Sequence, residues 1–161
     1  MPISDALKLI FDLFYRFYRI VTNRPKIICD EVYTSPARWK PDYIPECLRN
    51  GSANEETSGV EILCNVSFSL SNEGAVDTSI KDIYIDVKYV DPKRSQERHS
   101  RLDCAFQKGV VVGPRRTWSG GAVVCGTLWG VDELPKNMET TLVIEPVSQK
   151  PVCKKIRLWF E

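Results

Sequence analysis

His99 is the single histidine of the chain and the side chain best suited to acid–base chemistry near neutral pH. It lies in the polar stretch 91–101, DPKRSQERHSR, which we interpret as a connection between two strands. A general base needs a positioned partner, and the sequence pattern supplies none for His99. We therefore predict no catalytic residue and interpret His99 as a solvated loop residue.

Three acidic pairs offer the oxygen ligands that hard cations prefer, and they are Asp30-Glu31, Glu55-Glu56 and Asp132-Glu133. None belongs to a loop with the regular ligand spacing of a calcium site. The chain also has no glycine-rich phosphate loop, no Gly-x-Ser-x-Gly elbow and no His-Glu-x-x-His helix. These patterns predict no metal, no cofactor and no enzymatic activity.

The cysteines are widely spaced and include no Cys-x-x-Cys pair, which favours buried, reduced thiols. Cys64 and Cys125 have a separation that would suit an inter-sheet disulfide of an immunoglobulin domain. However, no Trp follows on the strand after Cys64, and Val123 occupies the place of the usual corner tyrosine. The six cysteines are Cys29, Cys47, Cys64, Cys104, Cys125 and Cys153.

Two groups of basic residues could bind phosphate groups if their loops lie at one end of the fold. Arg115 and Arg116 form one group, whereas the other is mixed with acidic residues, so scattered solvated charges are the favoured interpretation. The net charge of +1 gives no strong nucleic-acid signal. The mixed group consists of Lys93, Arg94, Arg98 and Arg101.

Residues 25–161 are predicted to form the β-domain that positions these side chains. Apolar and polar residues alternate along Val60–Leu70 and Ser79–Val90, which is the period of a half-buried strand. About seven such segments and no second helix predict an immunoglobulin-like antiparallel β-sandwich. A long polar loop is expected at about 35–59, because this stretch contains several prolines and is irregular. The other strands are expected at Lys26–Thr34, Arg101–Gln107, Gly109–Val112, Thr117–Leu128, Thr140–Val147 and Val152–Phe160.

Several short motifs of this domain resemble those of a known group of proteins. Arg24-Pro25-Lys26 leads into a strand, Ser71-Asn72-Glu73-Gly74 follows Val66–Leu70, and Val112-Gly113-Pro114 precedes a later strand. This order resembles small prokaryotic proteins of unassigned function with an immunoglobulin-like or CARDB-like sandwich behind a membrane-proximal helix. The resemblance implies a fold and no reaction. We expect Gly74 to supply a permissive backbone angle for the turn.

Residues 1–24 are predicted to form an amphipathic helix, with Ile3–Val21 as its regular part. Five charged residues fall on one narrow stripe of about 80° at the helical period, and they are Asp5, Lys8, Asp12, Arg16 and Arg19. The opposite face is the predicted contact surface for a membrane or a partner, and it consists of Ile3, Leu7, Ile10, Phe11, Phe14, Phe17, Tyr18 and Val21. The predicted contacts to anionic groups are Arg16, Arg19, Arg24, Lys26, Arg115 and Arg116.

A lone transmembrane span is disfavoured, because Asp12 near mid-bilayer would cost about 2.5–3.5 kcal/mol. A bundle of spanning helices with the charged stripes facing inward is compatible with the pattern. A helix that lies in the membrane interface suits the pattern better. Three alternatives stay open: the helix covers the chain's own sheet, packs against a second copy, or binds another protein. A secretory signal is not indicated, since Asp5 and Asp12 interrupt the apolar part. We therefore expect a cytoplasmic interaction or scaffold module held peripherally at the inner face of the membrane, with a soluble self-assembling protein as the alternative.

Overall fold

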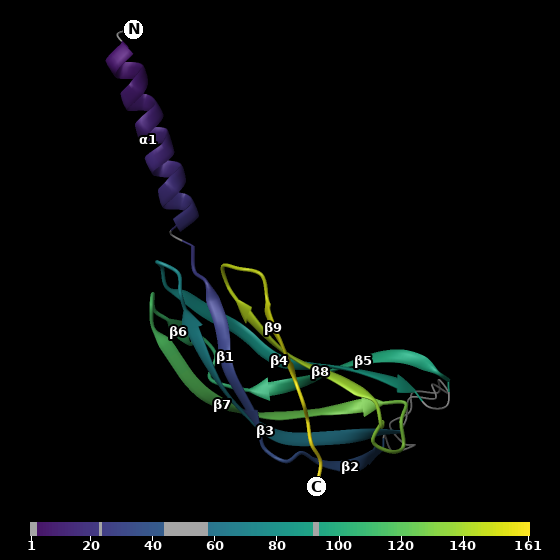
Figure 1. Cartoon of the computed structure of the whole chain (residues 1–161). Helices are drawn as coiled ribbons and strands as arrows, with labels where there is room; N and C mark the ends of the chain where they lie inside the picture. The colour runs from purple at the N-terminus through teal and green to yellow at the C-terminus, as the bar shows by residue number, and fades with distance from the viewer. Residues whose placement is uncertain (1–2, 23, 44–57, 92–93) are drawn as a thin grey trace.

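In the computed structural model, the described residues form one helix that leads into a body of nine β-strands (Figure 1). The structure describes residues 3–22, 24–43, 58–91 and 94–161, with the backbone alone for residues 3–6, 9, 19–22, 42 and 43. Helix α1 spans Ile3–Thr22, close to the predicted range. It ends before Pro25, which agrees with the aversion of the residue before proline to the helical region.

All nine strands belong to one antiparallel sheet with the order β1-β3-β7-β5-β4-β8-β9. Two short strands lie off this path, since β2 pairs with β3 and β6 pairs with β4. The strands are β1 (Ile27–Thr34), β2 (Arg38–Tyr43), β3 (Ser58–Asn72), β4 (Thr78–Asp91), β5 (Gln96–Ala105), β6 (Val111–Val112), β7 (Thr117–Trp129), β8 (Met138–Pro146) and β9 (Val152–Ile156).

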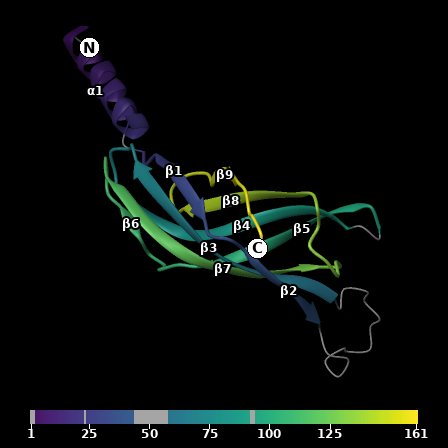
Figure 2. The same cartoon turned by 60° about the horizontal axis from the view of Figure 1, so that its bottom comes forward.

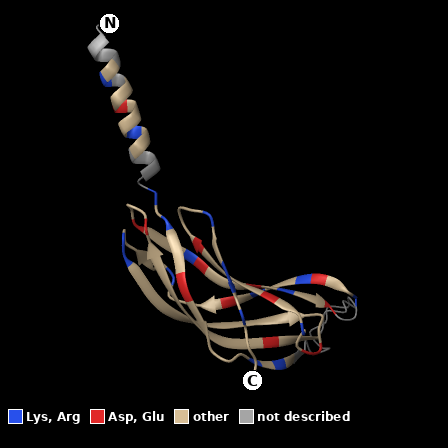
Figure 3. Ribbon diagram, in the orientation of Figure 1, with Lys and Arg blue, Asp and Glu red and all other residues tan. Residues whose placement is uncertain are grey.

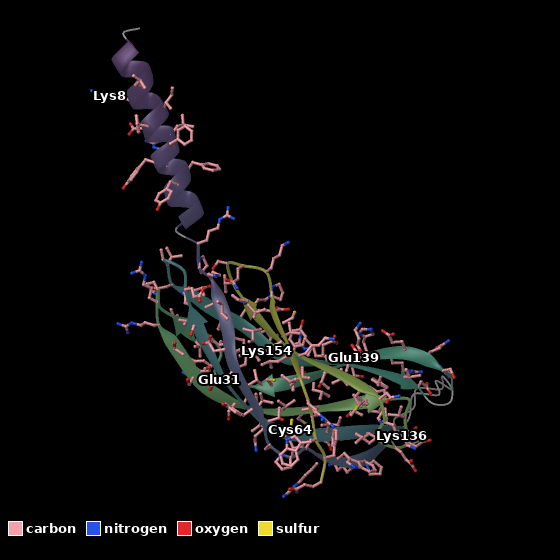
Figure 4. The ribbon with its side chains drawn as sticks, viewed as in Figure 1. Lys8, Glu31, Cys64, Lys136, Glu139 and Lys154 are labelled. Carbon is pink, nitrogen blue, oxygen red and sulfur yellow. The ribbon has the colours of Figure 1, made fainter. Side chains whose placement is uncertain are left out.

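The predicted two-sheet sandwich is wrong in one respect, because the sheet is continuous and nearly closes into a barrel. Strand β5 joins the two halves, since its Asp103 pairs with Tyr84 of β4 and with Cys125 of β7. Side chains bridge the remaining gap between β1 and β9. The Lys154 ammonium of β9 donates to the Cys29 carbonyl oxygen at 3.1 Å (Figure 4). The pairing of β5 with both β4 and β7 depends on the register between strands that are distant in the sequence. The alternation of residues within one strand does not encode that register.

The core fills the inside of the sheet as the alternating pattern predicts. In β4, Ile83, Ile85 and Val87 are buried, and the residues between them face outward. The buried side of β3 is likewise the predicted one. Its members are Val60, Ile62, Cys64, Val66, Phe68 and Leu70. Each Å² of apolar surface that these side chains remove from water contributes about 25 cal/mol to the stability of the fold.

The predicted loop at 35–59 contains a strand that the prolines concealed. Residues 38–43 form β2, and Trp39 and Pro41 pair with Ile62 and Val60 of β3. Proline is tolerated here because β2 pairs with β3 alone among the named strands, so the missing N–H falls on an edge. Ser58 and Gly59 belong to β3. Residues 44–57, with Cys47 and Glu55-Glu56, lie outside the described residues.

Candidate interaction surface

Helix α1 exposes both of its faces to solvent. Phe11, Phe14 and Phe17 are 72%, 70% and 67% exposed, values typical of residues without a packing partner. Figures 1 and 2 agree that α1 stands clear of the strands. The alternative in which the helix covers the chain's own sheet is therefore wrong for the described side chains. The predicted contact residues found exposed are Leu7, Ile10, Phe11, Phe14, Phe17 and Tyr18.

The charged stripe lies on the opposite side of α1, as predicted. Lys8, Asp12 and Arg16 are exposed, and Figure 4 shows Lys8 near the end of the helix that is remote from the body. Ile3, Arg19 and Val21 fall within α1, but their side chains lie outside the described part of the structure. Among the described residues, no helix combines the length and the apolar character needed to cross a bilayer.

The linker between α1 and β1 is clamped onto the body by the turn after β3. The Glu73 amide donates to the Lys26 carbonyl oxygen at 2.9 Å, and the Lys26 ammonium contacts the Glu73 carboxylate at 2.6 Å. A Cβ added to Gly74 would lie 2.2 Å from the Arg24 carbonyl oxygen. Glycine is therefore needed at position 74 for this close approach. Its predicted role in supplying a positive backbone angle is wrong, because Gly74 is not among the positive-φ glycines.

Asn72 is the hub of this clamp and is 1% exposed. Its side-chain oxygen accepts hydrogen bonds from the amides of Lys26 at 3.1 Å and Gly74 at 2.9 Å. Its side-chain nitrogen donates to the carbonyl oxygens of Val76 at 2.8 Å and Val112 at 2.9 Å. One buried amide thus satisfies four backbone groups from three segments. The sequence marked Asn72 only as part of a turn.

Asn72 also holds the turn that carries Arg115 and Arg116. The Arg115 amide donates to the Asn72 carbonyl oxygen at 2.7 Å, and the Asn72 amide donates to the Arg116 carbonyl oxygen at 3.0 Å. The fold therefore brings together two groups of residues that were predicted to contact anionic groups. Arg24 and Lys26 of the linker form one group, and the arginine turn forms the other. These segments are about ninety residues apart in the sequence, but both bond to Asn72, the linker through its side chain and the turn through its backbone.

We use the name helix-proximal rim for residues 24–26, 73–77, 113–116 and 147–151, which lie at the end of the body next to α1 (Figure 3). The last of these turns is tied in by Gln149, whose side-chain oxygen accepts from the Ile27 amide at 2.9 Å. The rim holds five basic residues against the two acidic residues Glu73 and Asp77. The basic residues are Arg24, Lys26, Arg115, Arg116 and Lys150, the last of which the sequence reasoning missed.

The second predicted basic loop is not part of this surface. Arg98 and Arg101 belong to strand β5, and the hairpin that joins β4 to β5 lies at the end of the body remote from α1 (Figure 1). Arg98 contacts the buried Asp91 carboxylate at 3.1 Å. The Arg101 guanidinium contacts the Asp82 carboxylate and lies over the ring of Tyr84. The two basic groups therefore do not meet at one end of the fold, and Lys93 lies outside the described residues.

His99 lies in a strand and not in a loop, which corrects the sequence interpretation. It sits on β5, opposite Lys88 of β4, with its side chain half exposed. Its Nε2 lies 3.3 Å from a Glu97 carboxylate oxygen, and its Nδ1 lies 3.8 Å from one of Asp86. These contacts are on the outer face of the sheet, where solvent screens them. Within the described residues, no three metal-binding side chains gather into a site.

The five described cysteines are free thiols. Cys64 and Cys125 cannot form the bridge that their separation suggested, because Cys64 points into the core and Cys125 points outward. Burial raises the pKa of the Cys64 thiol to about 11 and that of the Cys104 thiol to about 12, which suits inert core residues. The Cys125 thiol is exposed and donates to the Glu61 carboxylate at 3.4 Å.

A groove of about 850 Å³ lies at the other end of the body, between the start of β8 and the C-terminal segment. Its size falls in the range of ligand sites. Apolar side chains such as Tyr89, Met138 and Phe160 share the lining with Lys136 and Glu139, which Figure 4 shows far from α1. Glu97 and Thr140 also belong to the lining of this groove.

Comparison with known proteins yields fold similarity at a distance. No protein-family model matches the chain, and no curated protein matches it. One similar solved structure is a Bordetella pertussis protein that carries the provisional name ApaA, with 12% identity over 86% of this chain and 97% of that chain and a TM-score of 0.37. Another is the structural-genomics target SoR45, with 10% identity over 80% and 86% of the two chains and a TM-score of 0.34.

Proposed function

We propose that this protein is a non-enzymatic interaction module that its N-terminal helix positions at a membrane surface. The observation that carries the proposal is the exposed apolar face of α1, which the chain's own sheet leaves uncovered. Isolated helices of this length are marginal in water, and most helices gain stability by packing an apolar face. Helix α1 therefore needs a surface outside the body.

A membrane interface fits the side chains of α1 better than bulk lipid does. Aromatic and aliphatic groups occupy the wide face, and Lys8, Asp12 and Arg16 form the polar stripe that would face water. The basic helix-proximal rim would meet anionic headgroups when the helix lies flat. The resemblance to prokaryotic sandwich proteins with a membrane-proximal helix agrees with this proposal and stays a prediction. Free thiols suit the cytoplasmic side of that membrane.

Self-assembly through α1 is the second candidate, and the residue spacing favours it. Six apolar residues recur at alternating intervals of four and three, as in a coiled-coil seam. The flanking positions carry apolar residues such as Phe11, Leu13 and Tyr18, where coiled coils place pairing charges. The repeat also covers fewer than three heptads, so we rank this candidate second. The spaced residues are Ile3, Leu7, Ile10, Phe14, Phe17 and Val21.

Flotation of the full chain with phospholipid vesicles tests the proposal. Replacing both Phe14 and Phe17 by Gln removes two large apolar groups while keeping good helix formers. Each buried Phe contributes about 1.5–3 kcal/mol, so vesicle binding should fall at least 100-fold. The matched control replaces Lys8 and Asp12 by Gln, which leaves the net charge and the apolar face unchanged.

Two outcomes would count against the membrane. A full-length chain that stays in the soluble fraction with every vesicle would exclude anchoring. A lipid-free oligomer in sedimentation velocity that dissociates in the Phe14→Gln, Phe17→Gln variant would favour self-assembly.

A further inference from the structure

We propose that the turn bearing Arg115 and Arg116 binds the phosphate groups of anionic phospholipids, so that the body meets the membrane by its helix-proximal rim as well as through α1. This inference rests on the proposed membrane attachment and adds a second contact with its own chemistry. It concerns a different segment of the chain from α1.

The turn presents two consecutive guanidinium groups on a fixed backbone. Arg115 has a φ of 54°, in the left-handed region that non-glycine residues seldom adopt. The Arg116 amide closes the turn onto the Gly113 carbonyl oxygen at 3.2 Å, and two hydrogen bonds to Asn72 hold the turn on the body. A conformation of this kind is strained and persists only when its surroundings determine it.

Both arginines keep their charge available for a ligand. They are exposed, and within the part of the chain that the structure describes neither forms an ion pair. The Glu73 carboxylate beside them is already paired with Lys26 at 2.6 Å. Asp77 is the other nearby carboxylate, and it lines the adjoining groove. Among the described residues, neither carboxylate forms an ion pair with the arginines of the turn.

A shallow groove of about 350 Å³ lies against the turn, with room for a phosphate group. The two arginines line it together with Ser71, Asn72, Thr117 and Glu73, whose carboxylate is paired with Lys26. Guanidinium groups bind phosphate through paired N–H donors in a planar fork. On the far side of Arg116, the half-buried Trp118 and the exposed Val111 line a second groove. Trp side chains favour the membrane–water interface.

The position of the turn selects a lipid phosphate over other sources. Asn72 bonds both the turn and the linker, so the arginines lie at the base of α1. Insertion of α1 therefore brings the arginines to the headgroups. Attraction to an anionic surface acts within about one Debye length, roughly 8 Å in physiological salt. The net charge of +1 provides no wider field for nucleic acid.

The test compares vesicles of phosphatidylcholine alone with vesicles that contain phosphatidylserine, using the full chain. The variant Arg115→Asn with Arg116→Gln removes both guanidinium groups, and Asn tolerates the left-handed backbone at position 115. At about fivefold per basic residue near the surface, we expect affinity for the anionic vesicles to fall about 30-fold. Binding to phosphatidylcholine vesicles should not change. A urea unfolding curve establishes that the variant folds.

The matched control replaces Arg38 and Arg157 by Gln. This control makes the same change in charge as the variant. Because both arginines are exposed and remote from α1, the control should bind within about twofold of the wild type. Equal losses in variant and control would overturn the proposal, and so would wild-type binding of the variant to anionic vesicles. Binding of an oligonucleotide that depends on Arg115 and Arg116 would overturn the proposal, because the ligand of the turn would then be nucleic acid and not lipid. Failure of the membrane proposal looks different, because the wild type would then bind neither vesicle.

Discussion

Helix α1 and the β-body use the same types of apolar residue with opposite outcomes. Phe68 of β3 is 3% exposed and packs against Trp118 with ring centroids 5.6 Å apart, whereas Phe14 of α1 is 70% exposed. The body buries its own hydrophobic groups, whereas those of α1 stay exposed to solvent. This difference teaches where to look for function. Substitutions of buried apolar residues in the body should change stability, while those of exposed apolar residues in α1 should change attachment.

The sharpest way to break this comparison is to make the same substitution in both regions. Phe68→Ala should destabilise the fold by about 3–5 kcal/mol, because it leaves a cavity in the core. Phe14→Ala should change the free energy of unfolding by less than about 0.5 kcal/mol and weaken vesicle binding instead. Urea unfolding and vesicle flotation of both variants measure the two effects. Equal destabilisation by the two substitutions would mean that α1 packs on the body in solution.

The junction of the two regions gives the next largest effect. Asn72→Ala should destabilise the fold by about 3 kcal/mol, since it leaves four backbone groups at the junction without their partner. Asn65→Ala is the control on the same strand, because Asn65 is exposed, and its change should stay within about 0.5 kcal/mol. Urea unfolding at neutral pH compares them. Similar values for the two variants would contradict the role of Asn72 as a buried hub.

Buried thiols should make the body sensitive to alkali. Burial raises the pKa of Cys104 from an ordinary 9.0 to about 12, so the folded state holds this proton more tightly than the unfolded state does. The resulting contribution is complete below pH 9 and is lost as the pH rises towards 12. At pH 10 it should have fallen by about 1 kcal/mol in urea titrations with reductant. Cys104→Ala should reduce this loss, and Cys153→Ala, an exposed thiol, should not.

Acid should have the smallest effect, through an ion pair on the outer face of the sheet. A hydrogen bond from Arg101 lowers the pKa of the Asp82 carboxyl from its ordinary value of 3.8. The pair therefore stabilises the fold above that value and is lost as the pH falls below it. Asp82→Asn should cost about 0.5 kcal/mol at pH 7 and nothing near pH 2. Unfolding curves at the two pH values test this. The control is the exposed Glu133→Gln, because Asp103 also pairs with Arg101.

Sequence patterns predicted the core and the helix because both follow a local period. The alternation in Val60–Leu70 identified the buried face of β3, and the stripe through Lys8 and Asp12 identified the polar face of α1. They failed where partners lie far away in the sequence. Strand β2 was not predicted, because it contains Pro41 and proline is tolerated in a strand only at a sheet edge. Whether a strand lies at an edge depends on the tertiary structure.

By itself, the sequence determined a mainly β body with one amphipathic helix and no catalytic motif, since helix and strand periodicities are written in neighbouring residues. The tertiary structure alone decided three further matters. It closed the strands into one sheet and left α1 uncovered. It also placed Arg115 and Arg116 beside the linker through Asn72. The physical reason is the same in each case, because register and burial depend on contacts between residues that are distant in the chain.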